Sequence, residues 1–327
     1  MLAQKINAEQ FPANIKDTYM LKSLDLAVQA IILLLIFSMR TLVHAQNTME
    51  FVQDGTFNSY DPPIPKGPTS IPQTLTFFTN KNGNDDEGIY FFKPQTGLTL
   101  TFSFDDQQFV TVPQHVTGMT FGSMSGATAS HVRAVQVVNN KYYFNDTARK
   151  IFTSHTEGPA GRGINLYSNV GIQVFLSAKP LYAKSASTAD TSRYYYGKMR
   201  LHFSRPVDNP VLSIVGLGAT TNFSGKHLGF STELELLTPD LELVRISGNE
   251  PMQLDSSGTK ILHTKTEING NCDSGAACGS IAVNGFKISN LVFGVYLRTD
   301  GGPGIWGTDK VTNSGDMWHV TVSLPEQ

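Results

Sequence analysis

The chain contains two cysteines, Cys272 and Cys278, in the segment NCDSGAACG. Such a pair could clamp a metal ion, cycle between thiol and disulfide, or form a permanent disulfide. Zinc normally needs four ligands, and no second Cys/His pair has a spacing that would complete a site. Redox pairs usually have two intervening residues at a helix N-terminus, whereas five residues separate these cysteines ahead of a predicted strand. A structural disulfide is therefore favoured, and closing this short loop would add about 2.4 kcal/mol of stability.

A polar loop, TNKNGNDDEG at residues 79–88, gathers side-chain oxygens between two predicted strands. Calcium takes six to eight oxygen ligands with flexible geometry, so oxygens at alternate positions suit it. The candidate ligands are Asn80, Asn82, Asn84 and Asp86. The loop departs from the twelve-residue calcium-loop pattern, and a solvated hairpin loop is the alternative interpretation. Calcium is the candidate cofactor that the sequence suggests.

A glycine-rich loop, TDGGPGIWGTD at residues 299–309, combines Asp300, Trp306 and Asp309. Sugar-binding sites use an aromatic ring for the apolar face of a pyranose and carboxylates for its hydroxyl groups. These three residues are therefore candidate ligand-binding residues. The alternative is a turn in which Trp306 packs against the core.

Catalytic groups are sparse in this sequence. The seven histidines after residue 45 show no HExxH or other metal-binding spacing, and no GxSxG segment follows a predicted strand. Acidic pairs such as Asp105–Asp106 and Glu233/Glu235 could hydrolyse glycans only if they faced each other across a cleft. Glu233 and Glu235 are more simply explained as the solvent-facing side of a strand. The sequence thus predicts no catalytic residues and no enzyme, with a secreted glycan-active hydrolase as an alternative.

The elements that carry these residues are predicted to be β-strands. In KMRLHF, residues 198–203, alternation places Met199, Leu201 and Phe203 on one face. The segments VLSIVGLG, LVFGVYLRT and MWHVTVSLP alternate in the same way. Short strands separated by Gly/Pro/Asn turns predict an all-β fold, an antiparallel β-sandwich or jelly roll.

Two turns can be predicted from their residue types. STELELL and LELVRIS, joined across Thr238-Pro239-Asp240, predict a hairpin. Asn284-Gly285 predicts a tight turn, because this dipeptide best tolerates positive φ.

The N-terminus predicts a secretory signal peptide. The apolar run Leu26–Phe37 is too short for a comfortable membrane span, Lys22 supplies a basic region, and Val43 and Ala45 predict cleavage after Ala45. Translation could start at Met20, and an uncleaved anchor helix is the alternative.

Charge and length define the rest of the chain after cleavage. The signal peptide contains four Lys/Arg and three Asp/Glu, so 21 of 25 basic and 24 of 27 acidic residues stay in the mature chain. This near-neutral balance lacks the basic stripe of a nucleic-acid-binding protein. We expect a signal peptide at 1–45, an N-terminal β-rich region at 46–150 and a β-sandwich module at 151–327, and the latter two could share one domain. No transmembrane segment is expected after cleavage.

The segments RYYYGKMRLHFSRPVDNPVLSIVGLGA, LELVRISGN, AACGSIAVNGFKISNLVFGVYLR and GDMWHVTVSL resemble a module of secreted bacterial surface proteins of adhesin type. In those proteins the module often precedes Ig-like repeats. The resemblance covers about residues 150–325 and implies a β-sandwich of unassigned activity. The resemblance would lead us to expect an LPxTG-type anchor further along, whereas the sequence reads SLPEQ at its last residues.

Together these features predict a secreted or cell-surface β-sandwich protein without enzymatic activity. Its expected partner is an extracellular glycan or a surface protein, and not a nucleic acid. The alternatives are a passive structural module of an envelope or matrix and the glycan-active hydrolase.

Overall fold

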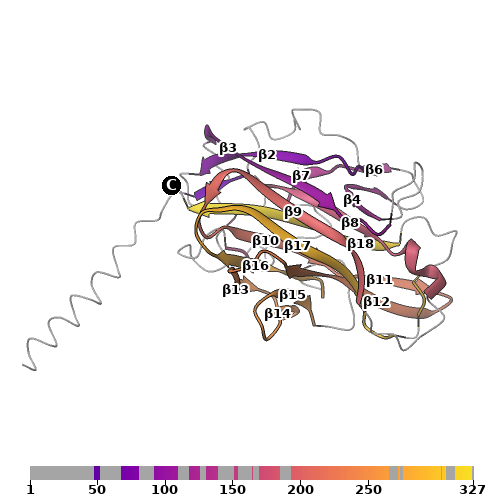
Figure 1. Cartoon of the computed structure of the whole chain (residues 1–327). Coiled ribbons are helices and arrows are strands. Elements are labelled where there is room, and N and C mark those ends of the chain that lie inside the picture. The colour runs from indigo at the N-terminus through magenta and orange to yellow at the C-terminus, as the bar shows by residue number, and fades with distance from the viewer. Residues whose placement is uncertain are drawn as a thin grey trace, which may run out of the picture. The chain divides into compact units, whose positions relative to one another are not determined.

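Antiparallel strands make up most of the regular structure in Figure 1, a computed structural model of the chain. The structure describes residues 48–51, 68–80, 92–109, 118–125, 130–138, 151–153, 164, 169–184, 193–264, 272, 275–302, 304–306 and 314–325. The predicted signal peptide lies outside these ranges. Within them, no helix has the length and hydrophobicity needed to span a membrane.

The first part of the chain contributes mostly short strands. They are β1 (Thr48–Glu50), β2 (Gln73–Asn80), β3 (Phe92–Asp105), β4 (Met119–Phe121), β5 (Ser123–Ser125), β6 (Ser130–Val132) and β7 (Val135–Val137).

The second part contributes the longer strands and one 3-10 helix, η2. They are β8 (Val170–Ser177), η2 (Lys179–Lys184), β9 (Arg193–Val207), β10 (Val211–Leu217), β11 (Ala219–Phe223), β12 (Lys226–Leu236), β13 (Glu242–Gly248), β14 (Met252–Leu254), β15 (Lys260–His263), β16 (Ala277–Asn284), β17 (Ile288–Thr299) and β18 (Gly315–Pro325).

One long antiparallel sheet joins nearly all of these strands. Its order is β13-β16-β10-β18-β1-β2-β3-β9-β17-β12-β15-β14; β11 pairs with β12, and β8 joins β18 to β4 and β7. The two ends of this order, β13 and β14, are connected by a short turn in which the Met252 N–H donates to the Asn249 carbonyl (3.2 Å). The sheet therefore curls into a nearly closed, barrel-like arrangement. The all-β antiparallel prediction is confirmed, and the finer sandwich or jelly-roll description stays a prediction.

Both predicted parts of the mature chain contribute to this sheet. β3 from the region 46–150 pairs with β9 from the region 151–327, with Leu100 opposite Phe203 and Asp105 opposite Lys198. Residues Ala45–Gln327 form one compact unit. The two regions thus share a sheet.

Three connections join consecutive strands that do not pair with each other. β9 pairs with β3 and β17 while β10 pairs with β16 and β18; β12 pairs with β11, β15 and β17 while β13 pairs with β16. The connection from β16 to β17 is of the same kind. The predicted hairpin across Thr238-Pro239-Asp240 is therefore wrong. Its strands exist, but each pairs with another strand, and their buried side chains belong to one shared core.

Two of these connections hold each other in place. The Asn209 N–H donates to the Gly285 carbonyl (2.9 Å), and the Gly285 N–H donates to the Asn209 side chain (3.0 Å). The Asp208 carboxylate accepts from the Lys287 N–H (2.7 Å). A turn does form after Asn284, but its left-handed residue is Lys287 (φ 54°) rather than the glycine.

The core between the strands is rich in aromatic residues. Phe51 and Phe77 pack with ring centroids 4.3 Å apart, and Phe104 stacks on Phe121 at 4.1 Å. The largest fully buried side chains are Trp318, Tyr196, Phe51, Phe77, Phe102, Phe121, Phe152, Phe203, Phe230 and Phe293. Burial of this much apolar surface supplies the main driving force for folding.

A buried carboxylate joins two separated parts of the sheet. Asp316 on β18 is fully buried, and its two oxygens accept from the N–H groups of Gly218 (3.0 Å) and Thr232 (2.6 Å). Gly218 lies where β10 ends and β11 begins, and Thr232 lies on β12. Asp316 thus satisfies backbone donors at the point where the chain leaves one strand pairing for another. Burial raises its pKa to about 6, although these hydrogen bonds act in the opposite direction.

Candidate functional site

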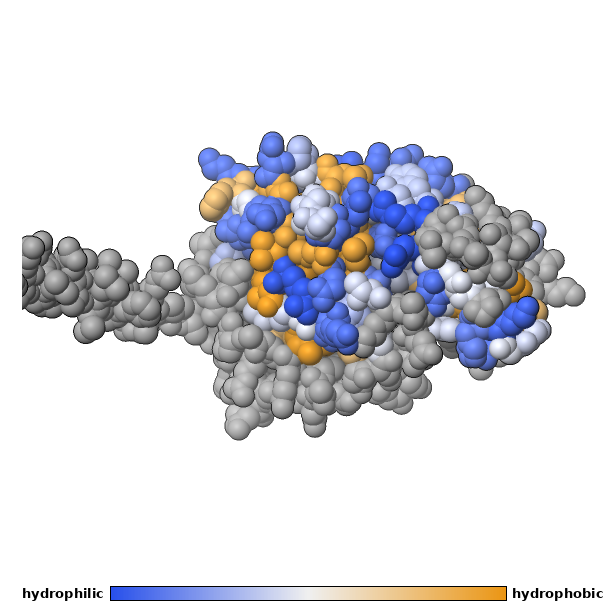
Figure 2. Space-filling model, turned by 90° about the horizontal axis from the view of Figure 1, so that it is seen from below, coloured by the Kyte–Doolittle hydropathy of each residue, from blue (hydrophilic) through white to orange (hydrophobic). Residues whose placement is uncertain are grey.

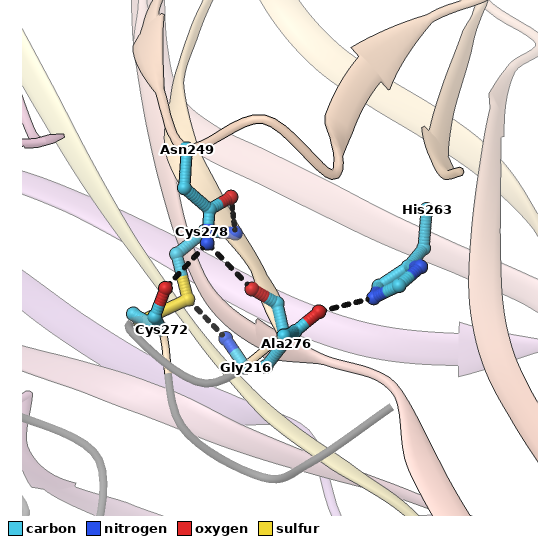
Figure 3. The surroundings of a disulfide bond; sticks show 7 residues. Gly216, Asn249, His263, Cys272, Ala276 and Cys278 are labelled. Carbon is cyan, nitrogen blue, oxygen red and sulfur yellow. Dashed lines mark hydrogen bonds between the residues drawn. A yellow bond between two sulfur atoms is a disulfide. The ribbon is translucent and has the colours of Figure 1, made fainter. Parts of the chain in front are cut away.

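The two cysteines form the predicted disulfide, and both are buried. The Cys272–Cys278 bond has a Cα–Cα distance of 5.6 Å, and the exposed fractions are 4% and 0%. Cys278 Sγ also accepts from the Gly216 N–H at 3.2 Å (Figure 3). The bond therefore serves as a buried structural link.

Asn249 braces the loop that the disulfide closes (Figure 3). Its side-chain nitrogen donates to the carbonyls of Cys272 (2.6 Å) and Ala276 (2.7 Å), and its oxygen accepts from the Cys278 N–H (3.0 Å). Next to it, a ring nitrogen of His263 lies 2.6 Å from the Gly275 carbonyl. Sequence reasoning missed Asn249, because nothing in its local pattern points to a loop more than twenty residues further along.

The candidate calcium ligands fall largely outside the described residues. Asn80 ends β2, where its backbone is the register partner of Phe92 on β3. Asn82, Asn84 and Asp86 lie outside the ranges that the structure describes. Among the residues inside those ranges, no group of three or more His, Cys, Asp or Glu side chains could hold a metal ion. The calcium site stays a prediction.

Two of the three candidate sugar-binding residues, Asp300 and Trp306, lie within the described residues. Trp306 is 2% exposed and packs on Phe230 (centroids 5.5 Å apart) and edge-on against Tyr194 (5.7 Å). Asp300 accepts from the Gly302 N–H at 2.8 Å, within its own turn. Asp309 lies outside the described residues. A sugar platform needs an exposed ring, so Trp306 as placed contributes to core packing, which was the alternative interpretation.

The acidic pairs instead belong to a lattice of ion pairs on the outward side of the sheet. Arg193 bridges Glu233 (Nε to Oε2, 2.7 Å) and Glu235 (2.8 Å), and Arg298 also contacts Glu233 (2.9 Å). The side chain of Glu233 is only 4% exposed, so the prediction of a fully solvent-facing pair is wrong for this residue. Lys260 lies 3.8 Å from Glu235 and extends the lattice to β15.

The other acidic pair anchors the opposite end of this lattice. Arg200 Nε lies 2.8 Å from an oxygen of Asp105, and Lys198 Nζ lies 3.4 Å from Asp106. The Tyr195 hydroxyl donates to Asp106 at 3.0 Å. Charged groups therefore follow one another across neighbouring strands.

Tyrosine rings fill the middle of the lattice. Tyr195 on β9 and Tyr296 on β17 have ring centroids 5.2 Å apart. The guanidinium of Arg193 lies over the Tyr296 ring at 3.5 Å. A Cβ on Gly294 would come within 3.1 Å of the Tyr296 ring, so the absence of a side chain there leaves room for it. Tyr296 is thus held from two sides, and Tyr195 lies beside it with part of its surface exposed.

These residues form a cross-strand row, which we define as Asp106, Tyr195, Tyr296, Arg193, Glu235 and Lys260. They lie on or next to β3, β9, β17, β12 and β15, which are neighbours in the sheet. Four gaps between strands span about 19 Å. The row therefore offers an extended surface in which two neighbouring tyrosine rings are flanked by charged groups.

A β-bulge in β9 creates the row. Gly197 is opposite Val295, but Tyr195 is opposite Tyr296, so β9 contains one extra residue between these pairs. The bulge reverses the alternation: Met199 remains buried on one side of it, while Tyr195 on the other side faces outward with Arg193. Gly197 has φ 150° and no room for a side chain.

The surroundings fix the protonation states of two groups in the row. Burial alone would raise the pKa of Glu235, but the hydrogen bond and charge of Arg193, together with Lys260, lower it below its usual value. Burial and the hydrogen bond to Asp106 raise the pKa of Tyr195 to about 12. At neutral pH the row presents an ionised Glu235 and an uncharged Tyr195. An ionised carboxylate with a lowered pKa is a poor proton donor for general acid catalysis.

Figure 2 shows the hydropathy of one face of the molecule. Figure 2 looks from below, where β13, β14 and β15 lie in Figure 1, and shows hydrophobic residues bordered by hydrophilic ones. Val244 on β13 is 37% exposed. In the cross-strand row the aromatic rings contact charged side chains: the Arg193 guanidinium lies over the Tyr296 ring, and the Tyr195 hydroxyl donates to Asp106.

No protein-family model, no curated protein and no solved structure matches this chain.

Proposed function

We propose that this protein is secreted or displayed at the cell surface and binds an extracellular glycan through the cross-strand row without chemically altering it. The proposal includes the sandwich-like layering and the adhesin-type character predicted from the sequence. The observation that carries it is the packing of Tyr195 against Tyr296 beneath Arg193, with Asp106 and Glu235 as hydrogen-bond acceptors.

This combination matches the chemistry of a sugar. A pyranose has an apolar face that packs on an aromatic ring and hydroxyl groups that both donate and accept hydrogen bonds. The exposed fractions of Asp106 (51%) and Lys198 (38%) leave both charged groups within reach of a ligand on Tyr195. The fixed side chains reduce the entropy that binding would cost.

The extracellular location is supported by the disulfide and by the predicted signal peptide. Disulfides such as Cys272–Cys278 persist mainly in oxidising compartments.

The proposal is tested by binding the purified mature chain to a glycan array. We expect Tyr195→Ala to lower binding of the glycan about tenfold, because it removes the partly exposed ring. Tyr182→Ala is the matched control, since Tyr182 on η2 is 44% exposed and is not part of the row. Equal binding by wild type and a folded Tyr195→Ala variant would contradict the proposal.

The hydrolase alternative is separated by a turnover assay. If a polysaccharide panel is cleaved and Glu235→Gln abolishes the cleavage, the row is an active site rather than a binding surface. Absence of binding to any glycan or surface protein would favour the passive structural module.

A further inference from the structure

We infer that the ligand of the cross-strand row is a neutral saccharide chain rather than an anionic polysaccharide. This inference rests on the proposed function and adds the chemical class of the glycan. It follows from the charge balance of the row and its surroundings, from the partners of each charged group, and from the orientation of the row across the strands.

Among the residues that the structure describes, the charged side chains that form ion pairs in and around the row cancel. The cationic side chains are Arg193, Lys198, Arg200, Lys260 and Arg298, and the anionic ones are Asp105, Asp106, Glu233, Glu235 and Asp255. Five positive charges therefore face five negative charges. A site built for a uronate or sulfate would carry an excess of positive charge, as sites for anions generally do.

Each of these cations already has a carboxylate partner. The ion pairs of Arg193, Arg200 and Arg298 have N–O distances of 2.7 to 2.9 Å. Lys198 and Lys260 have looser partners at 3.4 to 4.0 Å. An anionic ligand would compete with these carboxylates, because each guanidinium would have to leave its partner or share it. A neutral ligand meets no such competition.

The ion pairs leave some hydrogen-bonding positions of the charged groups unused, and hydroxyl groups can occupy them. A carboxylate has about four acceptor positions and an ammonium has three donors, so one ion pair does not saturate either group. Asp105 and Arg200 are each 41% exposed and face the same side as Tyr195. A hydroxyl can accept from the cation and donate to the carboxylate at once, which requires no net charge on the ligand.

The orientation of the row favours a chain of sugars over a single ring. Tyr195, Tyr296 and Glu235 lie on three adjacent strands, and Lys260 continues the row onto β15. Asp106 follows the end of β3 on the opposite side. Contacts at both ends of a row that crosses five strands require an extended ligand.

The experiment compares neutral polysaccharides, such as glucans and mannans, with polyuronates and sulfated glycans, at low and high salt. We expect a neutral polymer to bind, with an affinity that changes less than about twofold with salt, because screening acts on charge–charge attraction. Asp105→Asn should add salt-sensitive binding to polyuronates, since it frees the charge of Arg200. Arg200→Gln is the matched variant, because it removes a positive charge in place of a negative one. It should not add binding to polyuronates.

The outcomes separate the inference from the proposed function. Preferential binding of the wild type to an anionic glycan, lost at high salt and dependent on Tyr195, overturns the neutral ligand while the binding site stands. Binding only to a surface protein, or glycan binding that Tyr195→Ala leaves unchanged, overturns both. Salt-insensitive, Tyr195-dependent binding to a neutral polymer supports both.

Discussion

Tyr195 on β9 is the register partner of Tyr296 on β17, and their ring centroids lie 5.2 Å apart. Two residues further along β9, Gly197 is opposite Val295, which directly precedes Tyr296. The two tyrosines therefore meet only because β9 contains an extra residue. The candidate site depends on this irregularity of the backbone as much as on the side chains.

Gly197→Ala tests this dependence. A Cβ at Gly197 would come within 2.8 Å of Met119 Cε and 3.0 Å of the Asp105 carbonyl, at φ 150°. We expect a loss of about 1 to 3 kcal/mol in the free energy of unfolding, measured with urea. Ligand binding should weaken as well, because Tyr195 would shift. Gly225→Ala is the control: its φ is 76°, but a Cβ there has nothing within 4 Å, so it reports the backbone cost alone.

Asp316 should make the protein more stable in mild acid. Its pKa is raised to about 6 in the fold, so the stability it contributes is complete below the unfolded pKa near 4 and is lost as pH rises through 6. The shift corresponds to roughly 3 kcal/mol. We expect the unfolding free energy of the wild type, minus that of Asp316→Asn, to fall by about this amount between pH 4 and pH 7.

A carboxylate with a lowered pKa provides the control of opposite sign. Burial alone would raise the pKa of Asp255, but hydrogen bonds from Ser257 and from the Lys260 and Thr259 N–H groups lower it. The stability that Asp255 contributes is present above its unfolded pKa and is lost as pH falls.

For Asp316, a difference in unfolding free energy between wild type and Asp316→Asn that is constant with pH would contradict the raised pKa.

His319, on the same strand, should act against Asp316. Burial lowers its pKa to about 4, so the stability it contributes is present above its unfolded pKa near 6.5 and is lost as pH falls toward 4. The loss amounts to roughly 3 kcal/mol. Relative to His319→Gln, the wild type should lose unfolding free energy between pH 7 and pH 4, as followed by urea titration. A difference in unfolding free energy that does not change over this range would show that His319 is not held neutral.

The strands themselves could be predicted from the sequence. In β9, alternation correctly placed Met199, Leu201 and Phe203 in the core, where they are at most 1% exposed. The hairpin across Thr238-Pro239-Asp240 failed for a physical reason. Alternation and turn residues specify two strands and a reversal of the chain, but they do not specify whether the strands pair with each other or lie across the core from each other.

The candidate site could be predicted only in part. The spacing of Cys272 and Cys278 and a predicted export signal were sufficient to predict the disulfide, because the prediction depends only on local sequence and on the expected compartment. The cross-strand row was not predictable. Its members come from strands far apart in the sequence, and simple alternation through the bulge at Gly197 would have placed Tyr195 on the buried side with Met199.

Asn249 should stabilise the disulfide loop as strongly as the disulfide does. Asn249→Ala would leave two carbonyls and the Cys278 N–H without their side-chain partner in a partly buried site, which should cost about 1 to 3 kcal/mol. Asn249→Asp should be no better, because a carboxylate cannot donate to the carbonyls of Cys272 and Ala276. Asn290→Ala is the control, since its contact with His202 is exposed and should matter by less than about 0.5 kcal/mol.

The effects of Asn249 and the disulfide should not add, because both hold the loop around Cys272. Replacing both cysteines with alanine should cost about 2.4 kcal/mol in the chain-entropy model. In a double-mutant cycle of this change with Asn249→Ala, we expect a coupling energy of about 1 kcal/mol or more in urea unfolding. Without the disulfide the loop is free to move, so the hydrogen bonds of Asn249 contribute less stability. Strict additivity would mean that Asn249 and the disulfide stabilise different parts of the fold.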